Sequence, residues 1–316
     1  MVTVMIPTYN QEEYIARAIE SALAQTYPDL EIVISDDAST DGTEYIVRKY
    51  LSHPNIKYFR QETNIGRVNN YHKILYEYAT GDWVLNLDGD DYLLRQDFIA
   101  EAIKAFENNP FPNVVLLCSD RYESDELENN PVLTCDYFWE KYDGTSVLLD
   151  YFGKERIFRI WHLTSIYKRD IAVKIGFYQH EITSSDQESL FRLILHGDIL
   201  YTNVKTAVWQ AHAKNVSKEL NKEKTISNLF EYVYVKNYAI ANNLVAVKKI
   251  EKWCKESIKN TVKKYIYVYA KSGGVCGGID FYCKVIKVFK EAVLAIFDIK
   301  VLGKMALSVL SSKERK

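Results

Sequence analysis

The sequence predicts an α/β protein with a Rossmann-like, mostly parallel sheet that is flanked by helices and followed by a helical C-terminal extension. Two observations support this prediction. Short apolar segments alternate with segments of helical spacing along the first part of the chain, which is typical of a parallel sheet covered by helices. Each apolar segment also ends abruptly in polar residues, and ligands bind beyond the carboxyl ends of such strands.

The opening residues predict a strand, a loop and a helix. Residues 2–6 form a short apolar run rich in β-branched side chains, and the sequence Pro-Thr-Tyr-Asn at 7–10 ends it. Residues 12–24 then carry apolar side chains at the spacing of an amphipathic helix. Proline and asparagine are residues that interrupt regular structure, so we place the first strand end at residues 7–10.

The same pattern repeats further along the chain. Residues 31–35 read as a second strand, and the polar turn at 36–43 leads into a second helix. A third short strand at 56–59 precedes a helix at 68–78, and a fourth strand follows at 83–87. Because these strands are expected to be parallel, their polar ends should meet at one edge of the sheet.

The fourth strand ends in the most acidic short segment of this region, with three carboxylates at 88–91. Residues i and i+2 of a strand point to the same side, so Asp88 and Asp90 should face one ligand while Asp91 faces away. Gly89, which has no side chain, keeps the chain narrow where it crosses between Asp88 and Asp90. Clustered carboxylates need a cation or donors, and Mg²⁺ or Mn²⁺ takes such oxygens together with substrate phosphates. A solvated acidic turn is the alternative for this motif taken alone.

Five segments in this order resemble glycosyltransferase family 2, whose members have the GT-A fold. They are residues 2–10, Asp-Asp-Ala-Ser-Thr-Asp-Gly at 36–42, Asn-Ile-Gly-Arg-Val-Asn-Asn at 64–70, Ala-Thr-Gly-Asp at 79–82 and Leu-Asp-Gly-Asp-Asp at 87–91. Their order and spacing are more specific than any single motif. The resemblance implies an inverting transferase that moves a sugar from a nucleotide-diphosphate donor, expected to be a UDP-sugar, onto an acceptor hydroxyl with Mn²⁺ or Mg²⁺.

The resemblance also implies which residues bind the nucleotide sugar. The Tyr9 ring is suited to stack on a pyrimidine, and Asp37 resembles the carboxylate that accepts a hydrogen bond from the base or ribose. Asp88 resembles the residue that contacts the ribose or supports the metal. Arg67 would meet the base or a phosphate, although a surface ion pair is an equal alternative. The full donor set is Pro7, Thr8, Tyr9, Asn10, Asp37, Asn64, Gly66, Arg67, Asp88, Gly89 and Lys214.

The metal ligands are expected at two places in the sequence. Asp90 resembles the family's metal ligand that reaches the diphosphate oxygens. The segment 208–217 resembles the last family element, in which His212 completes the metal shell or contacts the pyrophosphate and Lys214 neutralises it. A histidine whose hydrogen bonds are satisfied within a loop is the alternative.

The catalytic base must come from another segment, because an inverting transfer needs a group on the far side of the anomeric carbon from the leaving diphosphate. Residues 176–192 resemble the family segment that ends in an acidic pair ahead of a helix. Here Ser185 replaces the first acid and Asp186 keeps the second, so Asp186 is the predicted base. Glu181 and Glu188 are alternatives, and Asp186 also suits a helix cap.

The acceptor is expected near residues 159–165, which lie between the donor half of the chain and Asp186. Trp161 suits the apolar face of a sugar ring, although a core aromatic residue is an equal alternative. His162 is assigned to the acceptor with it.

Composition and charge suggest two regions. Residues 1–217, the expected nucleotide-sugar-binding and catalytic domain, carry 20 basic and 33 acidic side chains and a net charge of −13, whereas residues 218–316 carry 20 and 9, giving +11. The five cysteines lack paired metal spacing, so a reducing cytoplasm is expected. We also expect no signal peptide, and no apolar run approaches the ~20 residues of a membrane span.

The second region reads as helical, basic and amphipathic. A helical pattern over 216–269 is followed by a glycine-rich break at 272–278 and by an amphipathic stretch at 281–310. Such a helix packs on its own domain, forms a homodimer or lies on an anionic membrane. Nucleic-acid binding is not expected, because the basic residues lie in no recognised fold.

The sequence is therefore interpreted as a cytoplasmic hexosyltransferase, peripheral at the inner face of the plasma membrane, that builds a bacterial surface polysaccharide such as O-antigen or capsule, or a glycolipid. Its acceptor would be a carbohydrate or a lipid-linked oligosaccharide. A sugar nucleotidyltransferase is the first alternative, but residues 7–10 are not the glycine-rich triphosphate loop that it needs. A non-catalytic sugar-nucleotide-binding subunit is the second, because residues 178–185 depart from the family pattern.

Overall fold

The computed structural model describes residues 1–108, 113–127, 135–152, 158–212, 215 and 220–293 of the chain. The chain divides into two compact units. Unit 1 consists of Met1–Leu148, Arg156–Glu181 and Ser185–Asn215, and unit 2 of Leu149–Glu155, Ile182–Ser184 and Val216–Lys316. The domain boundary expected after residue 217 stays a prediction.

Unit 1 is built on one mixed sheet, which has nine strands within the described residues in the order β3-β2-β1-β4-β8-β6-β9-β5, with β7 beside β9. The pairs β1–β2, β1–β4, β2–β3 and β6–β9 are parallel, and the other pairs are antiparallel. The strands are β1 (Val2–Thr8), β2 (Leu30–Asp36), β3 (Ile56–Arg60), β4 (Trp83–Asn86), β5 (Tyr92–Leu93), β6 (Val114–Glu123), β7 (Glu140–Asp143), β8 (Ser165–Lys168) and β9 (Asp198–Trp209).

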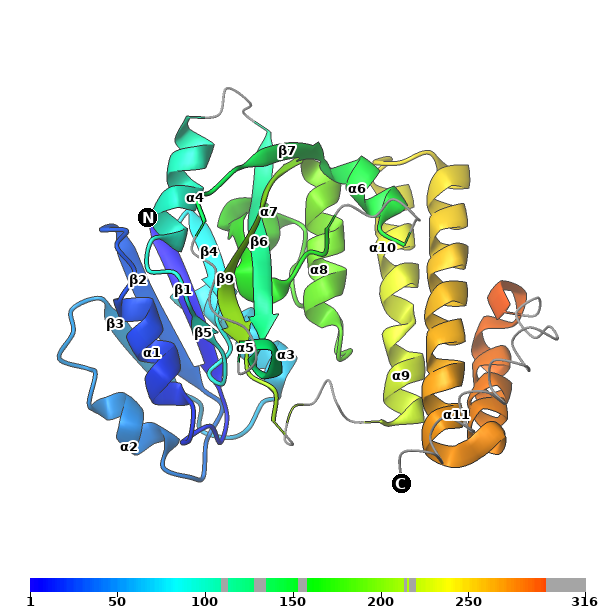
Figure 1. Cartoon of the computed structure of the whole chain (residues 1–316), viewed down its shortest axis with the longest axis horizontal. Helices are drawn as coiled ribbons and strands as arrows, with labels where there is room; N and C mark the ends of the chain where they lie inside the picture. Colours follow the sequence, from blue (N-terminus) through cyan, green and yellow to red (C-terminus); the bar gives the residue numbers. More distant parts are fainter. Residues whose placement is uncertain (109–112, 128–134, 153–157, 213–214, 216–219, 294–316) are drawn as a thin grey trace. The chain divides into compact units, whose positions relative to one another are not determined.

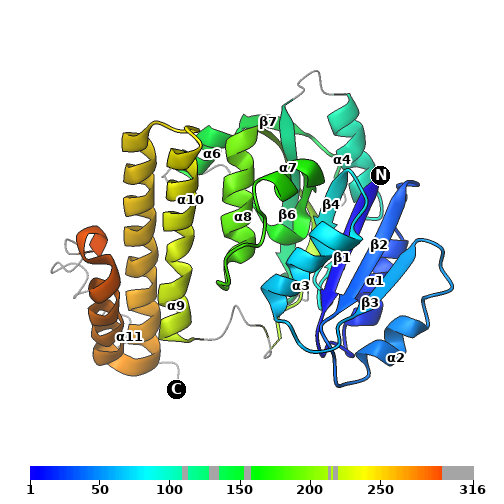
Figure 2. The same ribbon diagram turned by 180° about the vertical axis from the view of Figure 1, so that it is seen from behind.

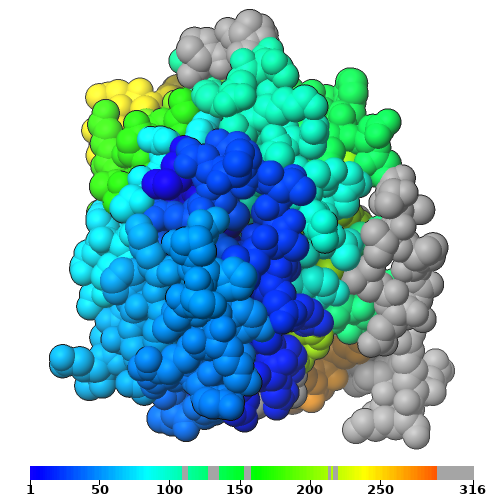
Figure 3. Space-filling view, turned by 90° about the vertical axis from the view of Figure 1, so that its left-hand side faces the viewer, coloured from blue at the N-terminus to red at the C-terminus, as the bar shows by residue number. Residues whose placement is uncertain are grey.

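Helices cover both faces of this sheet: α1 and α4 lie on one face and α3, α7 and α8 on the other (Figures 1 and 2). The N-terminal residues, in blue, form the surface beside edge strand β3 (Figure 3). The helical segments up to β9 are α1 (Ile15–Leu23), α2 (Thr43–Arg48), α3 (Arg67–Lys73), η1 (Ile74–Tyr78), α4 (Phe98–Glu107), α5 (Ser124–Leu127), α6 (Gly144–Asp150), η2 (His162–Thr164), α7 (Arg169–Lys174), α8 (Ser185–Leu193) and η3 (Ile194–His196).

The core explains why these segments fold as they do. Every residue of β1 and β2 is buried, as expected for parallel strands that are covered on both faces. Helix α1 buries Ile15, Ala18, Ile19 and Ala22, which recur at helical spacing and face the sheet. The alternation of strands and helices predicted from the sequence is confirmed.

Unit 2 contains three helices within its described residues: α9 (Lys222–Asn228), α10 (Phe230–Ala241) and α11 (Val247–Val293). Helix α11 is interrupted at Gly273 and Gly274, whose dihedral angles are not helical, and the chain reverses direction there (Figure 1). The predicted glycine-rich break is therefore confirmed. Among the described residues, no helix is long and apolar enough to cross a membrane.

The apolar residues after this break pack within unit 2. Phe281 and Val285 are fully buried, and the ring centroid of Phe281 lies 4.8 Å from that of Tyr269. Lys284 forms an ion pair of 2.9 Å with Glu223 of α9. These residues of the amphipathic stretch therefore pack on their own domain, which was one of the alternatives expected from the sequence. Residues 294–310 of that stretch lie outside the described residues.

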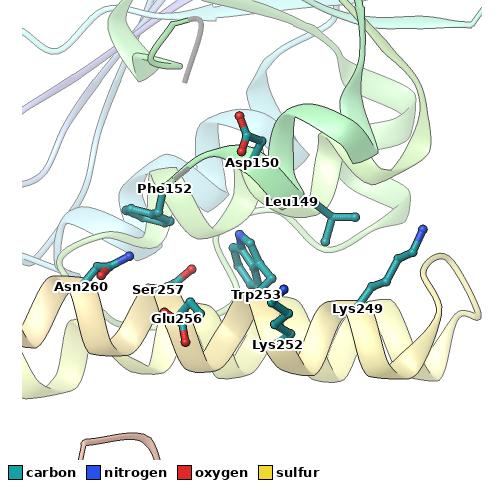
Figure 4. A pocket seen from close by; sticks show the side chains of 9 residues that line it. All are labelled: Leu149, Asp150, Phe152, Lys249, Lys252, Trp253, Glu256, Ser257 and Asn260. Atoms are coloured by element: carbon teal, nitrogen blue, oxygen red, sulfur yellow. The ribbon is translucent and has the colours of Figure 1, made fainter. Parts of the chain in front are cut away.

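Unit 2 also has a pocket of about 420 Å³. It lies between residues 149–152, which include the end of helix α6, and the first half of α11 (Figure 4). It is lined by Leu149, Asp150, Phe152, Lys249, Lys252, Trp253, Glu256, Ser257 and Asn260. None of the predicted donor, metal, base or acceptor residues lines this pocket.

A buried carboxylate joins three segments of unit 1. Glu31 of β2 is 5% exposed and accepts hydrogen bonds from Lys57 Nζ at 2.7 Å, from Thr80 N at 2.6 Å and from Thr3 Oγ1. Burial alone would raise the pKa of Glu31, but these hydrogen bonds outweigh it and the pKa is lowered. The ionised carboxylate therefore fixes the turn before β4 against β1 and β2.

We expect Glu31→Gln to lower the free energy of unfolding by about 1–3 kcal/mol at pH 7, because it leaves buried donors without a charged acceptor. A group with a lowered folded-state pKa stabilises the protein above its unfolded pKa, near ~4.3 for Glu, and loses that contribution as the pH falls through the folded pKa. The difference from the wild type should therefore shrink toward pH 3, as measured by urea unfolding. The exposed Glu62→Gln is the control, and a difference independent of pH would contradict this prediction.

Candidate active site

The ends of three parallel strands meet at one edge of the sheet in unit 1. The register pairs Thr8 of β1 with Asp36 of β2. After β4, Gly89 N donates a hydrogen bond to Pro7 O at 3.2 Å, and Asp37 N donates to Thr8 O at 2.9 Å. The predicted convergence of these strand ends is therefore seen in the structure.

Asp88 faces this edge with one oxygen already engaged. Its Oδ1 accepts hydrogen bonds from Tyr71 Oη at 2.7 Å and from Asn86 Nδ2 at 2.9 Å. Within the described part of the chain, Oδ2 has no hydrogen-bond partner. Asp88 is therefore oriented by α3 and β4 with one oxygen open to a ligand.

Asp90 lies against the loop that follows β9. Its Oδ2 is 2.8 Å from His212 Nε2 and 3.4 Å from Asn215 Nδ2, while the ring of His212 stacks on Tyr14. Burial and the charge of Asp88 raise the pKa of Asp90, and His212 opposes this shift. The two predicted metal ligands thus come together from positions far apart in the sequence. Within the described residues, no group of three or more His, Cys, Asp or Glu side chains is arranged to hold a metal ion.

Residues 88–91 form a turn in which Asp91 N donates a hydrogen bond to Asp88 O at 2.9 Å, so the strand alternation expected for these carboxylates is wrong. Asp91 instead contacts the end of β9. It is 3% exposed, and its Oδ1 accepts a hydrogen bond from the backbone N of Gln210 at 2.8 Å. Burial and the charges of Asp90 and Asp88 hold the pKa of Asp91 well above its usual range. Asp91 therefore anchors the end of β9 just before His212.

Gly89 lies close to side chains of the loop after β1. A Cβ at this position would lie 2.4 Å from Gln11 Oε1 and 3.0 Å from Thr8 Oγ1. Thr8 itself donates to Gln11 Oε1 at 2.8 Å. A side chain at position 89 would therefore displace the end of the Gln11 side chain, which is held by Thr8, and the role expected for Gly89 stays a prediction.

The first two strand ends form the other side of the site. Tyr9 is 45% exposed, which leaves its ring accessible to a ligand. Asn10 and Ala38 adopt positive φ angles of 52° and 61°, which non-glycine residues seldom do outside turns and functional sites. Asn10 Oδ1 accepts a hydrogen bond from Thr40 N at 2.8 Å, so the two loops hold each other in place.

Asp37 joins the second strand end to the loop before α3. Its oxygens accept hydrogen bonds from Ile65 N at 2.7 Å and Gly66 N at 3.0 Å. Gly66 N also lies 3.1 Å from Asn64 Oδ1, and Gly66 has a φ of 88°, which favours glycine. Contact of Asp37 with a base stays a prediction, and in this structure Asp37 positions the loop that carries Arg67.

Arg67 lies at the start of α3 among acidic and phenolic groups. Burial alone would lower the pKa of Arg67, but Tyr71, Asp186 and Asp88 raise it. Its guanidinium is 5.4 Å from the centroid of the Tyr71 ring. Arg67 therefore remains charged between the strand-end carboxylates and the predicted base. Lys214, the last predicted donor residue, lies outside the described residues.

Asp186 is in the first turn of α8, where the helix dipole favours a carboxylate. Its charge acts on Arg67, His162 and Arg121, so it belongs to the same group of side chains as Asp88. Its neighbour Ser185 is fully buried.

The two alternative bases are engaged elsewhere. Glu188 is fully buried and binds Arg192 through two hydrogen bonds of 2.6 and 3.0 Å. Glu181 accepts a hydrogen bond of 2.6 Å from Asn69 Nδ2. Glu188 is therefore a structural residue of α8.

The predicted acceptor residues are held by different partners. Trp161 donates from Nε1 to Asp120 Oδ1 at 3.2 Å. His162 Nε2 lies 2.7 Å from Tyr178 Oη, and burial lowers the pKa of His162 against the opposing charges of Asp186 and Asp88. His162 is therefore favoured in its neutral form beside the predicted base.

Three side chains of this site were missed in the sequence. Tyr71 orients Asp88, and Asn215 contacts both Asp90 and His212. Arg121 lies near the end of β6, with its guanidinium 4.1 Å from the ring centroid of Trp161. The sequence shows Arg121 only as a charged residue near the end of an apolar strand, and its place beside Trp161 depends on the register of β6 with β9.

Comparison with known sequences identifies the family. Residues 3–176 match the sequence profile described as "Glycosyl transferase family 2". The chain belongs to glycosyltransferase family 2. The resemblance described from its motifs is thereby confirmed, and a family member of this kind acts on a nucleotide-sugar donor and an acceptor.

Two curated relatives illustrate the relationship. The poly(ribitol-phosphate) β-N-acetylglucosaminyltransferase TarS of Staphylococcus aureus is 38% identical over 96 residues, which are 30% of this chain and 17% of TarS. The chondroitin synthase of Escherichia coli is 26% identical over 284 residues, covering 82% of this chain and 37% of the synthase. The chain thus spans well under half the length of these relatives.

The fold is shared with solved structures. The crystal structure of S. aureus TarS 1–349 superimposes with a TM-score of 0.69 at 20% identity and covers 99% of this chain and 90% of that one. The mannosyltransferase PcManGT of Pyrobaculum calidifontis gives a TM-score of 0.57 at 16% identity, with 99% and 86% covered. The GT-A fold with a helical C-terminal region is confirmed.

Proposed function

We propose that this glycosyltransferase is an inverting, metal-dependent enzyme that transfers a sugar from a UDP-sugar to an acceptor hydroxyl in the synthesis of a bacterial surface polysaccharide. The observation that carries this proposal is the meeting of Asp90 and His212 at the same strand ends as Asp88, with Asp186 in electrostatic contact with the same side chains as Asp88. A donor-side acidic group and a separate base are what an inverting displacement requires.

The relatives support parts of this proposal. One TarS structure is described as a complex with UDP-GlcNAc, and the PcManGT structure as a complex with GDP-Man and Mn²⁺. The names of TarS and chondroitin synthase both refer to polymers, poly(ribitol-phosphate) and chondroitin. For this chain, a uridine donor agrees with the exposed ring of Tyr9 beside Asp37, on which a pyrimidine would stack.

The residues present fit a divalent cation. Asp90 Oδ2 and His212 Nε2 already lie 2.8 Å apart, and burial and Asp88 raise the pKa of Asp90, so an added positive charge would relieve a local excess of negative charge. Mg²⁺ and Mn²⁺ need only one or two protein ligands when substrate phosphates and water supply the rest. A bound cation would stabilise the negative charge of the leaving diphosphate.

The remaining steps belong to the side chains. Asp186 takes the proton from the acceptor hydroxyl as that oxygen attacks the anomeric carbon from the side opposite the diphosphate. Asp186 lies in the first turn of α8, and its charge interacts with that of Arg67. His162, held neutral beside it, lines the acceptor side with Trp161.

The metal ligand is tested by Asp90→Asn, which deletes a charge but keeps the shape of the side chain. We expect this variant to lose Mn²⁺-dependent stabilisation by UDP in a thermal-shift assay, where ligand at ~100 times its Kd adds ~2.7 kcal/mol to the wild type. The exposed Asp136→Asn is the matched control. Mn²⁺-dependent UDP binding of unchanged affinity in the Asp90 variant would show that Asp90 is not the ligand.

The base is tested by Asp186→Asn, which should lower the turnover number by about 10²–10⁴-fold, the usual contribution of a general base, and leave UDP binding intact. The matched control is Glu181→Gln, which removes the alternative carboxylate and should keep most of the turnover. Near-normal turnover of the Asp186 variant, or loss of its UDP binding, would assign Asp186 to another role. Product formation by the wild type also separates this function from a non-catalytic nucleotide-binding subunit.

Peripheral membrane contact is the last part of the proposal. Phe281 and Val285 are buried in unit 2, so the contact would rest on exposed lysines of α11, such as Lys248 and Lys255, together with the +11 charge of residues 218–316. Lysines near an anionic bilayer contribute about 1 kcal/mol each, and salt screens this attraction.

The chain should therefore sediment with vesicles that contain phosphatidylserine at low salt and remain soluble at 1 M salt, which reduces the Debye length to about 3 Å. Vesicles of neutral lipid are the control. If sedimentation is absent at low salt, or equal for neutral and anionic lipid, the membrane contact is wrong.

A further inference from the structure

Two arginines converge on the tryptophan that was assigned to the acceptor. The guanidinium carbon of Arg121 lies 4.1 Å from the ring centroid of Trp161 and 5.0 Å from that of Trp209. The guanidinium carbon of Arg159 lies 5.4 Å from the Trp161 ring. Trp161 is itself fixed by its hydrogen bond to Asp120, so the ring forms a rigid support for both cations.

Neither arginine has an ion pair shorter than 4.0 Å in the described part of the chain. The nearest carboxylate to Arg121 is Glu123, at 4.0 Å and more than half exposed, and Arg121 Nε is buried without a hydrogen-bond partner among the described residues. Arg159 is exposed and has no ion pair in the described part of the chain. A buried guanidinium N–H group without an acceptor costs free energy. Such a group in a candidate active site indicates an acceptor atom that a ligand would supply.

The location points to the acceptor side of the reaction. The charge of Asp186, the proposed base, acts on Arg121, as does that of Asp91. Residues 1–217 carry a net charge of −13, so two arginines that meet on one ring are a local exception to the charge of this region. Guanidinium groups bind carboxylates and phosphates through paired hydrogen bonds.

We propose that Arg121 and Arg159 bind an anionic group, a carboxylate or a phosphate, on the acceptor saccharide near the hydroxyl that is glycosylated, while Trp161 packs against the sugar ring. This inference rests on the proposed glycosyltransfer and adds the acceptor's chemical class. An acceptor held in this way presents its hydroxyl to Asp186, and a neutral sugar of the same shape would leave the buried N–H of Arg121 unpaired.

The test compares acidic and neutral sugars that differ at one carbon. Binding of p-nitrophenyl β-D-glucuronide and p-nitrophenyl β-D-glucoside, and of glucose 6-phosphate and glucose, is measured by NMR titration in the presence of UDP and Mn²⁺. We expect the wild type to bind at least one acidic sugar about 10-fold to 100-fold more tightly than its neutral counterpart, the range for a hydrogen bond to a charged group. The two pairs distinguish a carboxylate from a phosphate.

The variants Arg121→Gln and Arg159→Gln should each reduce this preference, and the double variant should remove it, while the Kd of UDP changes by less than about twofold because the donor side is untouched. Arg48→Gln, at a surface ion pair with Glu44, is the control and should keep the preference. A wild type without preference, or variants that keep it, would overturn the inference.

The remaining outcome concerns the donor. If Arg121→Gln abolishes UDP binding, Arg121 contacts the donor diphosphate and the acceptor assignment is wrong. If the wild type itself does not bind UDP, the proposed function fails, whereas normal UDP binding without an acidic preference contradicts only the present inference.

Discussion

Mutual repulsion among the three carboxylates after β4 is the constraint on which the active-site geometry depends. Asp88, Asp90 and Asp91 lie within four residues of each other, and the pKa values of Asp90 and Asp91 are raised by burial and by this neighbouring charge. The fold holds them by giving each a different partner. These are a tyrosine hydroxyl for Asp88, a histidine ring for Asp90 and a backbone amide for Asp91.

These partners come from separate parts of unit 1, so the acidic motif also organises the surrounding elements. Asp91 receives the amide of Gln210, two residues before the histidine that contacts Asp90. Asp91 thus positions the segment that carries His212, the residue that contacts Asp90. Gly89 connects Asp88 and Asp90, and a Cβ there would displace the end of the Gln11 side chain.

Much of this site followed from the sequence, because strand ends in a parallel sheet have a fixed relation to one another. The meeting of Asp37, Asp88 and Asp90 needed only the alternation of strands and helices. The pair of Asp90 and His212 was found through the family motifs. What the sequence concealed were contacts set by register and side-chain direction. Asp37 binds the amides of Ile65 and Gly66, and Glu188 is committed to Arg192.

Arg121 shows the same limit most clearly. Its position at the carboxyl end of β6 depends on the parallel pairing of β6 with β9, in which Arg121 is opposite Ala207 with register shifts along the pair. No local pattern encodes such a register. With this register known, Asp186 is seen to interact with two cations of unit 1. Arg67 interacts with both Asp186 and Asp88 on the donor side, and Arg121 interacts with Asp186 and lies beside Trp161. Asp186 thus interacts with Arg67 and with Arg121, and it must accept a proton during the proposed reaction. An anionic acceptor group at Arg121 would partly neutralise that cation, so the electrostatic surroundings of the proposed base would depend on whether the acceptor is bound.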